Sequence, residues 1–387
     1  MPPMLKTADS SASILCVGNT WFPKSPGGAE RYVYELAHQW IAQGDRVELC
    51  ATDLPSQDVS PALLLTNLAA TQQPLPQRLW NCHRHFRQRR LVTPDAINLH
   101  FALYSFPLLS QFPAHVPITF NFHGPWALES RQEGGASYAV RLKYWLEQSV
   151  FRRCDRFIVL SKAFGEILHQ AYKVPWEQIW IIPGGVNTTH FQPNLSRQAA
   201  REQLGWHRDR PILFTPRRLV HRMGIHQLLT ALVTVRQRVP EVWLAIAGKG
   251  PLRDDLAQQV EALGLQNAVH FLGYLPDEQL PVAYQAADLT VVPSQSLEGF
   301  GLILLESLAA GTPALCTPIG GMPEVVAALN PNLVTETPEA GAIATQLIAL
   351  LAGTVPLPSR SACRAYACQR FDWAIIAAQV RSVLLGL

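Results

Sequence analysis

The chain has 387 residues, more than one ordinary hydrophobic core organises, so two domains are expected. Apolar residues make up 48% of it, which is enough for two cores and excludes a disordered chain. The formal net charge of +3 is small for this length, so the composition does not indicate nucleic acid as a partner.

Short apolar runs alternate with amphipathic stretches through the first half of the chain. The run ILCVG at 14–18 is typical of a buried strand, and 29–44 is typical of a helix that stops at Gly44. Further strands are expected at 47–51, 96–100, 118–123, 156–161 and 179–183. Repeated strand–helix–strand units predict a parallel sheet with helices on both faces.

The same pattern starts again after the turn-rich segment 183–194, which marks a boundary between modules. Strands are expected at 212–216, 243–248, 269–273, 289–293 and 313–317. We therefore expect an α/β chain with one doubly wound domain over 1–188 and a second over 189–370. The apolar last helix, 371–387, is expected to pack back on the N-terminal domain. Ligands of such sheets bind beyond the carboxyl ends of the strands, so a cleft between the two sheets is the expected site.

Cysteine usage and the N-terminus predict where the chain resides. Seven cysteines occur without a CxxC pair and mostly in apolar runs, which favours buried, reduced thiols. The first 13 residues lack the order of a signal peptide, and no run reaches 18 apolar residues. A cytoplasmic protein is expected, with peripheral membrane contact left open. The basic run HRHFRQRR at 83–90, near Trp80, is either a solvated face or a contact with an anionic membrane.

Two glycine-containing loops lie between a strand and a helix. In the loop 18–30, Gly27 and Gly28 allow a ligand to approach the backbone, and the helix that follows favours a phosphate there. The spacing is not that of a dinucleotide fingerprint, and an ordinary loop remains the alternative. The loops 247–252 and 317–326 have the same character but indicate little on their own.

The second loop, in PSQSLEGFGLILLESL at 293–308, carries two acidic residues eight positions apart. Glu298 lies in the loop, a helix is expected to begin at about Leu302, and Glu306 falls in its second turn. A phosphate would lie at the helix start, with a sugar on the Glu298 side and a ribose on the Glu306 side. The alternative is that both are solvated charges.

Several motifs together resemble a known family. EGFGLILLE, with VVPS before it and SLAAGTPALCTPIGGMPEVV after it, resembles the donor-site signature of family 4 glycosyltransferases. Further matches, in the expected order over about residues 13–387, are PGGAERYVYELAHQW, PGGVNTTHFQP, LAIAGKGPL, VHFLGYLPDEQL and the closing FDW helix. HGPW with RRLVHRMG resembles members that build cell-surface polysaccharides. The resemblance implies a retaining enzyme of GT-B fold, in which two Rossmann-like domains face each other across a cleft.

The resemblance also implies roles for individual residues. Three would act closest to the reacting sugar: Glu298 on its hydroxyls, His123 beside the reacting carbon, and Arg218 on the diphosphate. The backbone N–H groups of Gly299, Phe300 and Gly301 would help Glu298 to bind the sugar, and the helix start at Leu302 would face the diphosphate. The others would bind the remaining parts of the donor, with Glu306 on the ribose, Gly248 and Leu275 at the base, and Gly27 and Gly28 facing the phosphates and acceptor.

One position departs from the family pattern. The family usually has a lysine five residues after the arginine, where this chain has Met223. We expect Arg222 to supply the missing charge, because a guanidinium binds phosphate as a fork. The alternative is that Arg222 is a surface charge and Arg218 suffices.

These features predict transfer of a sugar from a nucleotide-diphosphate sugar, UDP or GDP, to a glycan or lipid-linked acceptor. No DxD sequence occurs, so no metal cofactor is expected and arginines would neutralise the leaving diphosphate. The alternatives are a nucleotide-sugar epimerase of the same architecture and a non-catalytic nucleotide-sugar binder. The sequence leaves the sugar, the base and the acceptor open.

Overall fold

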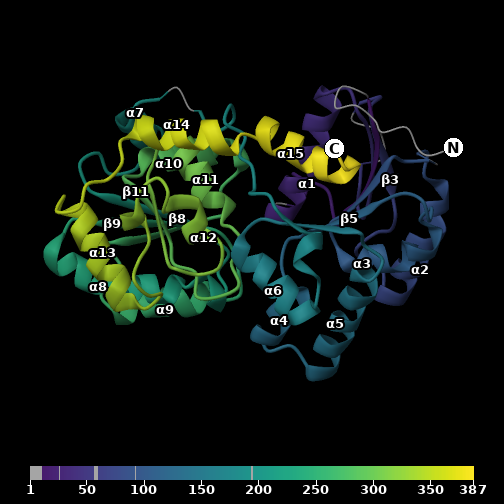
Figure 1. Cartoon of the computed structure of the whole chain (residues 1–387). Coiled ribbons are helices and arrows are strands. Elements are labelled where there is room, and N and C mark those ends of the chain that lie inside the picture. The colour runs from purple at the N-terminus through teal and green to yellow at the C-terminus, as the bar shows by residue number, and fades with distance from the viewer. Residues whose placement is uncertain (1–10, 26, 56–59, 92, 193–194) are drawn as a thin grey trace. The chain divides into compact units, whose positions relative to one another are not determined.

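The computed structural model describes residues 11–25, 27–55, 60–91, 93–192 and 195–387. It separates into two compact units (Figure 1). Unit 1 comprises the described residues up to Gly184 together with Trp373–Leu387, and unit 2 comprises Gly185–Asp372. The sequence boundaries were placed at 188 and 370.

Unit 1 contains a parallel seven-stranded sheet in the order β3-β2-β1-β4-β5-β6-β7. Its strands are β1 Ser13–Val17, β2 Arg46–Ala51, β3 Leu63–Asn67, β4 Ala96–Leu99, β5 Ile118–Phe122, β6 Arg156–Val159 and β7 Ile179–Ile181. Its helices, apart from α15, are α1 Gly28–Ala42, α2 Leu75–His85, α3 Ala102–Ser105, α4 Trp126–Gln132, α5 Ser137–Phe151 and α6 Lys162–Tyr172, with short 3₁₀ turns η1 Phe86–Gln88, η2 Phe106–Gln111 and η3 Trp176–Gln178. The strand order reverses between β1 and β4, so the loops after these strands lie at the switch point where such sheets bind ligands.

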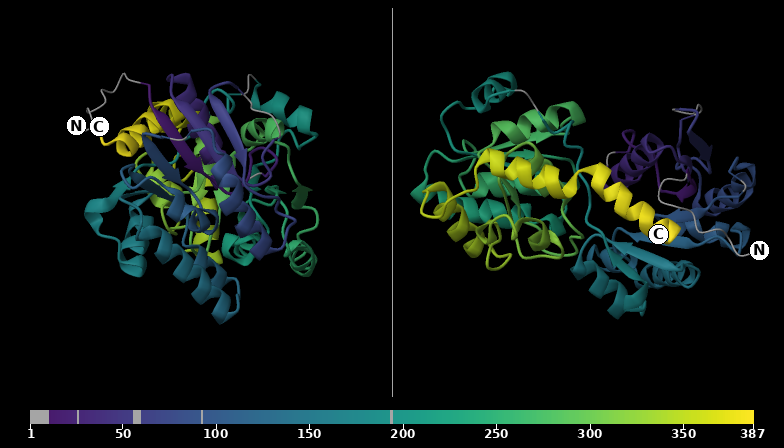
Figure 2. Two further views of the ribbon diagram at one scale, coloured as in Figure 1. Left: turned by 90° about the vertical axis from the view of Figure 1, so that its right-hand side faces the viewer. Right: turned by 45° about the horizontal axis from the view of Figure 1, so that its top comes forward.

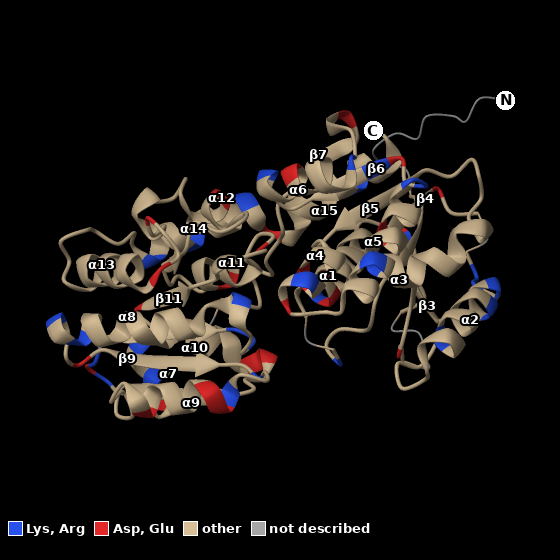
Figure 3. Ribbon diagram, turned by 90° about the horizontal axis from the view of Figure 1, so that it is seen from below, with Lys and Arg blue, Asp and Glu red and all other residues tan. Residues whose placement is uncertain are grey.

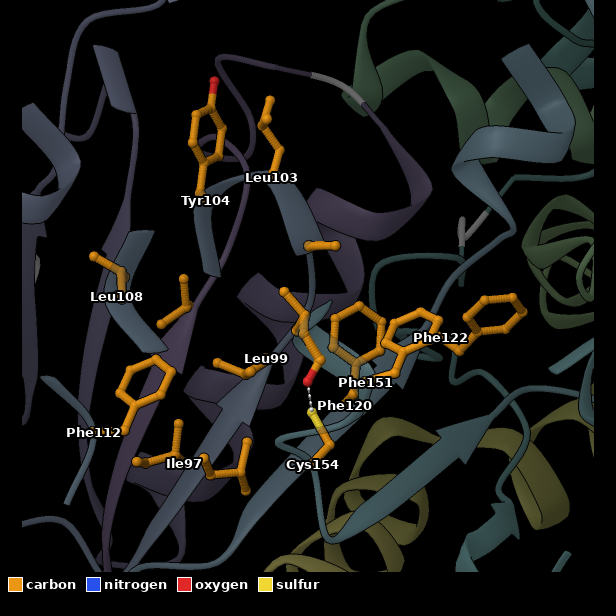
Figure 4. Close-up of a cluster of buried hydrophobic side chains, with 14 of the residues drawn as sticks. Ile97, Leu99, Leu103, Tyr104, Leu108, Phe112, Phe120, Phe122, Phe151 and Cys154 are labelled. Carbon is orange, nitrogen blue, oxygen red and sulfur yellow. Dashed lines mark hydrogen bonds between the residues drawn. The ribbon is translucent and has the colours of Figure 1, made fainter. Parts of the chain in front are cut away.

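Aromatic rings fill much of the core of unit 1, as Figure 4 shows. The ring of Phe120 on β5 lies 4.8 Å from that of Phe151, with an edge-to-face tilt of 65°. Phe122 on the same strand packs against Phe151 at 6.1 Å. Burial of these rings holds β5 against α5 and so fixes the end of β5, where His123 begins the next loop.

Unit 2 contains a parallel five-stranded sheet in the order β10-β9-β8-β11-β12. Its strands are β8 Ile212–Pro216, β9 Trp243–Ala247, β10 Val269–Gly273, β11 Leu289–Val292 and β12 Ala314–Cys316. Its helices are α7 Arg197–Leu204, α8 Ile225–Arg238, α9 Arg253–Ala262, α10 Leu280–Ala286, α11 Leu302–Ala309, α12 Met322–Val326, α13 Ala340–Leu351 and α14 Arg360–Phe371, with 3₁₀ turns η4 His221–Met223, η5 Asp277–Gln279 and η6 Pro331–Leu333. The switch point falls between β8 and β11, and the loops that follow these two strands carry Arg217 and Glu298.

The last helix, α15 Trp373–Leu385, belongs to unit 1 and packs along α1 (Figures 1 and 2). Arg381 makes a two-pronged ion pair with the buried Asp45, with Nε 2.7 Å from Oδ2 and Nη2 2.9 Å from Oδ1. The indole Nε1 of Trp40 donates to the carbonyl of Ala377 at 3.0 Å. Arg156 donates to the carbonyl of Val383 at 2.7 Å, which satisfies an orphan group at the helix end.

The cysteines are free and mostly buried, as the sequence predicted. All seven cysteines are free, and all except the partly exposed Cys368 are buried. Within the described ranges, no helix combines the length and the apolar character that a bilayer crossing requires.

Candidate functional site

The loop after β11 presents Glu298 to an arginine from the loop after β8. Arg217 Nη2 donates to Glu298 Oε2 and to Ser294 Oγ, and Ser294 Oγ donates to Glu298 Oε2 at 3.3 Å. The side chains of Arg217 and Glu298 are only 8% and 14% exposed. Because little water reaches this ion pair, the attraction between its charges is strong. The pair therefore fixes the orientation of the Glu298 carboxylate.

These contacts decide the charge of Glu298. Burial raises the pKa of this carboxyl, but the charge and hydrogen bond of Arg217, the charge of Arg222 and the hydroxyl of Ser294 together lower it below its ordinary value. Glu298 is therefore ionised at neutral pH and accepts hydrogen bonds rather than donating one. This suits binding of sugar hydroxyls and excludes a role as proton donor.

Arg217 is the residue that sequence reasoning missed. The motif comparison selected Arg218 of the Arg-Arg pair, whereas Arg217 is the buried member and Arg218 is exposed to solvent. Adjacent residues of an extended segment point to opposite sides, so only one of the pair can turn toward Glu298. The predicted contact of Arg218 with a diphosphate needs an exposed side chain and stays a prediction.

Backbone geometry holds the Glu298 loop in place. Gly301 caps α11 with a φ of 81°, and α11 begins at Leu302, as expected from the sequence. Gly320 has a φ of 58°, and a Cβ there would lie 1.8 Å from the carbonyl oxygen of Glu298. Gly321 N donates to that same oxygen at 3.1 Å. A glycine at position 320 is thus needed for the backbone to approach Glu298 closely.

Glu306 lies in the second turn of α11, as predicted, but it is mostly buried rather than solvated. The hydroxyl of the fully buried Tyr284 donates to Glu306 Oε2 at 2.8 Å. Tyr284 therefore fixes the rotamer of this carboxylate. The contact of Glu306 with a ribose stays a prediction. Tyr284 would orient the Glu306 carboxylate for that contact.

The Arg222 segment lies against the same loop. Met223 is buried, so its side chain is part of the core, whereas Arg222 Nη1 donates to the carbonyl of Leu297 at 3.2 Å. Gly248, after β9, has a φ of 139°, and a Cβ there would lie 1.9 Å from the Arg217 carbonyl oxygen. Leu275 is half-buried in the loop after β10. The structure thus gathers Arg217, Arg222, Gly248 and Glu298 at one end of the sheet of unit 2.

Three of the predicted residues, Gly27, Gly28 and His123, belong to unit 1, whereas Gly299 and Phe300 lie in the Glu298 loop of unit 2. Gly27 is the N-cap of α1 and Gly28 its first residue, but a Cβ at Gly27 would lie 2.1 Å from Oε2 of Glu30. Asn19 Nδ2 donates to Oε1 of Glu30 at 2.8 Å. A carboxylate therefore already lies at this helix start and opposes a phosphate there. Both predicted contacts, with the phosphates and with the acceptor, stay predictions.

His123 begins the loop after β5, and His100 begins the loop after β4. His100 Nδ1 lies 3.1 Å from His123 Nε2, and the two rings stack with an interplanar angle of 18°. Burial lowers the pKa of His123 to about 4, so this ring is neutral at pH 7. The sequence alone gave no role to His100. Its position directly after β4, the strand next to β5, is the feature that could have indicated a contact with His123.

In the part of the chain that the structure describes, no three His, Cys, Asp or Glu side chains gather in a way that could hold a metal ion.

Comparisons with known proteins identify the family of the chain. The model "Glycosyl transferases group 1" matches residues 196–370, and "Glycosyltransferase Family 4" matches residues 26–190. The D-inositol 3-phosphate glycosyltransferase of Mycolicibacterium smegmatis is 30% identical over 327 residues, covering 78% of this chain and 73% of the relative. The phosphatidyl-myo-inositol mannosyltransferase of Mycobacterium leprae is 29% identical over 376 residues, 92% of each chain. An uncharacterized glycosyltransferase of Methanocaldococcus jannaschii is 32% identical, with a match that spans 46% of each chain.

Solved structures show the fold. Sucrose-phosphate synthase from Thermosynechococcus elongatus superposes with a TM-score of 0.79 at 23% identity, covering 96% of this chain and 98% of that one. An Anabaena protein, HepE, solved with UDP and glucose, gives 0.77 at 22% identity, covering 97% and 100%. These structural matches confirm the predicted GT-B fold, and the family models and the curated relatives confirm the predicted enzyme class. The chain belongs to the family 4 glycosyltransferases.

Proposed function

We propose that the protein transfers a sugar, with retention of configuration, from a nucleotide-diphosphate sugar to a glycan or lipid-linked acceptor. The observation that carries this is the ionised Glu298, held by Arg217 and Ser294 beside the start of α11. An ionised carboxylate accepts hydrogen bonds from sugar hydroxyls, and a helix start with a nearby arginine attracts a diphosphate. Relatives named as a GDP-mannose-dependent mannosyltransferase and solved with UDP-glucose support donors of this class.

The residues divide the work of the reaction. The bond from the sugar carbon to the phosphate oxygen breaks, the acceptor oxygen bonds to that carbon on the same face, and the acceptor proton passes to the departing phosphate. Arg218, Arg222 and the N–H groups at Leu302 would neutralise the diphosphate as its charge develops. Glu298 and His123 would hold the sugar, since neither is suited to proton transfer at neutral pH.

A donor screen tests this function. We expect the melting temperature to rise with one class among UDP-, GDP- and ADP-sugars, because a ligand of the folded state stabilises it. The matched donor with lipid-linked and glycan acceptors should give a product of unchanged anomeric configuration, with and without EDTA. An inverted product, or loss of turnover in EDTA that magnesium restores, would contradict retention or metal independence. Interconversion of the donor without acceptor would instead identify an epimerase, and binding without turnover a non-catalytic binder.

Arg222 is proposed to replace the family lysine. Its guanidinium lies at the Glu298 loop and contributes to the lowered pKa of that residue. Arg222→Ala should weaken donor binding by about tenfold or more, the size of one charged hydrogen bond. Arg238→Ala, on the exposed last turn of α8, is the matched control. Donor affinity and turnover equal to wild type in Arg222→Ala would leave Arg218 as the sole cation for the diphosphate.

Peripheral contact with an anionic membrane is proposed at α2 and η1 of unit 1. Figure 3 shows arginine segments, coloured blue, on α2. Trp80 is 59% exposed, and the guanidinium of Arg84 lies 5.4 Å from its ring centre. Arg87 is also exposed, whereas Phe86, counted with the basic run in the sequence, is fully buried and takes no part. An exposed indole beside exposed cations suits a headgroup surface.

Sedimentation with vesicles tests this contact. The triple variant Trp80→Ser, Arg84→Ser, Arg87→Ser should lose most binding to anionic vesicles. The control, Arg208→Ser with Arg238→Ser, removes the same charge from exposed positions of unit 2. Equal retention of vesicle binding in the triple variant and the control would remove this proposal.

A further inference from the structure

A row of buried polar side chains crosses the carboxyl ends of two adjacent strands in unit 1. The hydroxyl of Tyr32 on α1 lies 3.2 Å from Asn121 Oδ1 on β5. Asn121 Nδ2 donates to Asn98 Oδ1 on β4. Asn98 Nδ2 lies 2.9 Å from His100 Nε2, and His100 Nδ1 lies 3.1 Å from His123 Nε2. The row therefore starts at a hydroxyl and ends at the histidine predicted to contact the donor sugar.

The first member sets the direction of the row. Tyr32 is fully buried, and its hydroxyl makes one hydrogen bond in the described structure, to Asn121. A buried hydroxyl proton left without an acceptor costs about 1–3 kcal/mol, so Tyr32 donates and Asn121 accepts through its oxygen. Each amide then accepts on one side and donates on the other. The reverse arrangement would turn two amides and leave the Tyr32 proton without an acceptor.

The direction carries through both imidazole rings. Asn98 donates to Nε2 of His100, so this nitrogen is an acceptor and the His100 proton must be on Nδ1. That proton is donated to Nε2 of His123. Burial lowers the pKa of both rings, and the row contains no carboxylate that would raise it again. Both rings are therefore neutral at pH 7. A neutral ring that accepts at Nε2 carries its proton on Nδ1.

The exposed end of the row is the remaining nitrogen of His123. His123 is half-buried, and its Nδ1 makes no hydrogen bond to any residue that the structure describes. The Tyr32 ring packs against the His123 ring with centroids 4.9 Å apart and an angle of 75°, which restricts rotation of the imidazole. The Nδ1–H group is thus held in one orientation by contacts that do not involve it.

We infer that Tyr32, Asn121, Asn98 and His100 are positioning residues that hold His123 in the Nδ1–H tautomer, so that it presents a fixed hydrogen-bond donor to its ligand. On the proposed function, the acceptor is an oxygen of the donor sugar. A preorganised donor of this kind needs no rearrangement when the ligand binds.

Nitrogen-15 NMR of the histidine side chains in the ligand-free protein tests the tautomer directly. The His123 signal, assigned by its loss in His123→Gln, should show a protonated Nδ1 and an unprotonated Nε2. His169 is an internal reference, because its Nδ1 lies 2.8 Å from the Val174 carbonyl and must carry the proton when neutral. A wild-type His123 with its proton on Nε2 would overturn the inference.

Two variants act on the row at different points. Tyr32→Phe removes the hydroxyl that sets the direction, so His123 should become a mixture of tautomers. Asn98→Asp replaces the donated N–H by a second acceptor, which should reverse both rings and move the His123 proton to Nε2. Tyr34→Phe, on the same helix but outside the row, is the matched control and should leave the tautomer unchanged. If Asn98→Asp does not fold, Tyr32→Phe decides alone, and an unchanged tautomer there contradicts the inference.

Steady-state kinetics test whether the Nδ1–H tautomer of His123 contributes to turnover. With the matched donor, Asn98→Asp should lower kcat by about 10²-fold, the effect of losing one preorganised hydrogen-bond donor. The loss of kcat should follow the fraction of reversed tautomer across the variants, which a merely structural change would not produce. A reversed tautomer with wild-type kcat would overturn the role in catalysis. The wild-type tautomer is measured without any substrate, so failure of the proposed transfer activity leaves that result standing.

Discussion

Glu298→Gln is expected to lower kcat/KM for the donor by about 10²-fold, with little loss of folded protein. The carboxylate accepts from Arg217 and Ser294 and is held ionised by them. A neutral amide accepts more weakly and presents an N–H on one side, so both the arginine and the sugar lose a charged hydrogen bond, each worth about 1.5–3 kcal/mol. The measurement is steady-state kinetics with the donor identified by thermal shift.

The control for Glu298→Gln is a substitution in the neighbouring helix α12. Glu324 is exposed in the first turn of α12, and Glu324→Gln removes the same charge without touching the pair. Arg217→Gln should be nearly as damaging as Glu298→Gln, and the double variant should be no worse than either, because the two side chains act as a unit. Independent, additive losses, or wild-type kinetics in Glu298→Gln, would show that the pair is only structural.

Arg381→Met is expected to destabilise the protein by about 3–5 kcal/mol, because it leaves a buried charge without its partner. Asp45 is fully buried, and it also accepts from the backbone N–H of Ala12 at 2.8 Å. Loss of the guanidinium removes both of its charged contacts at 2.7 and 2.9 Å. Urea denaturation followed by tryptophan fluorescence measures the change, since Trp40 and Trp373 are fully buried in this unit.

Two comparisons interpret the result for Arg381. Arg208→Met breaks an exposed pair with Glu202 at 3.4 Å and should cost less than about 1 kcal/mol. The double variant Asp45→Leu, Arg381→Met should recover part of the loss, because apolar residues can replace both members of a buried pair. Equal stability of Arg381→Met and Arg208→Met would mean that α15 is held by its apolar face alone.

Local patterns were sufficient for most of the architecture. Continuous apolar runs predicted eleven of the strands because strands buried on both faces need no polar residues. β3, Leu63–Asn67, was not expected: it lies at the edge of the sheet, only two of its five residues are buried, and it ends in polar residues rather than forming a continuous apolar run. The start of α11 at Leu302 followed from its glycines, and the spacing of Glu298 and Glu306 led to the family. These features depend on residues close together in the chain.

Pairing between distant residues was decided only by the tertiary structure. Glu298 and Arg217 are separated by 81 positions, and nothing local indicates which of two adjacent arginines turns inward. His100 and His123 are separated by 23, and only the adjacency of β4 and β5 makes them partners. The sequence by itself determined the family, the two sheets and the acidic pair of the donor loop. The tertiary structure decided the charge of Glu298 and the partner of His123, because both depend on burial and on which side chains meet across neighbouring strands.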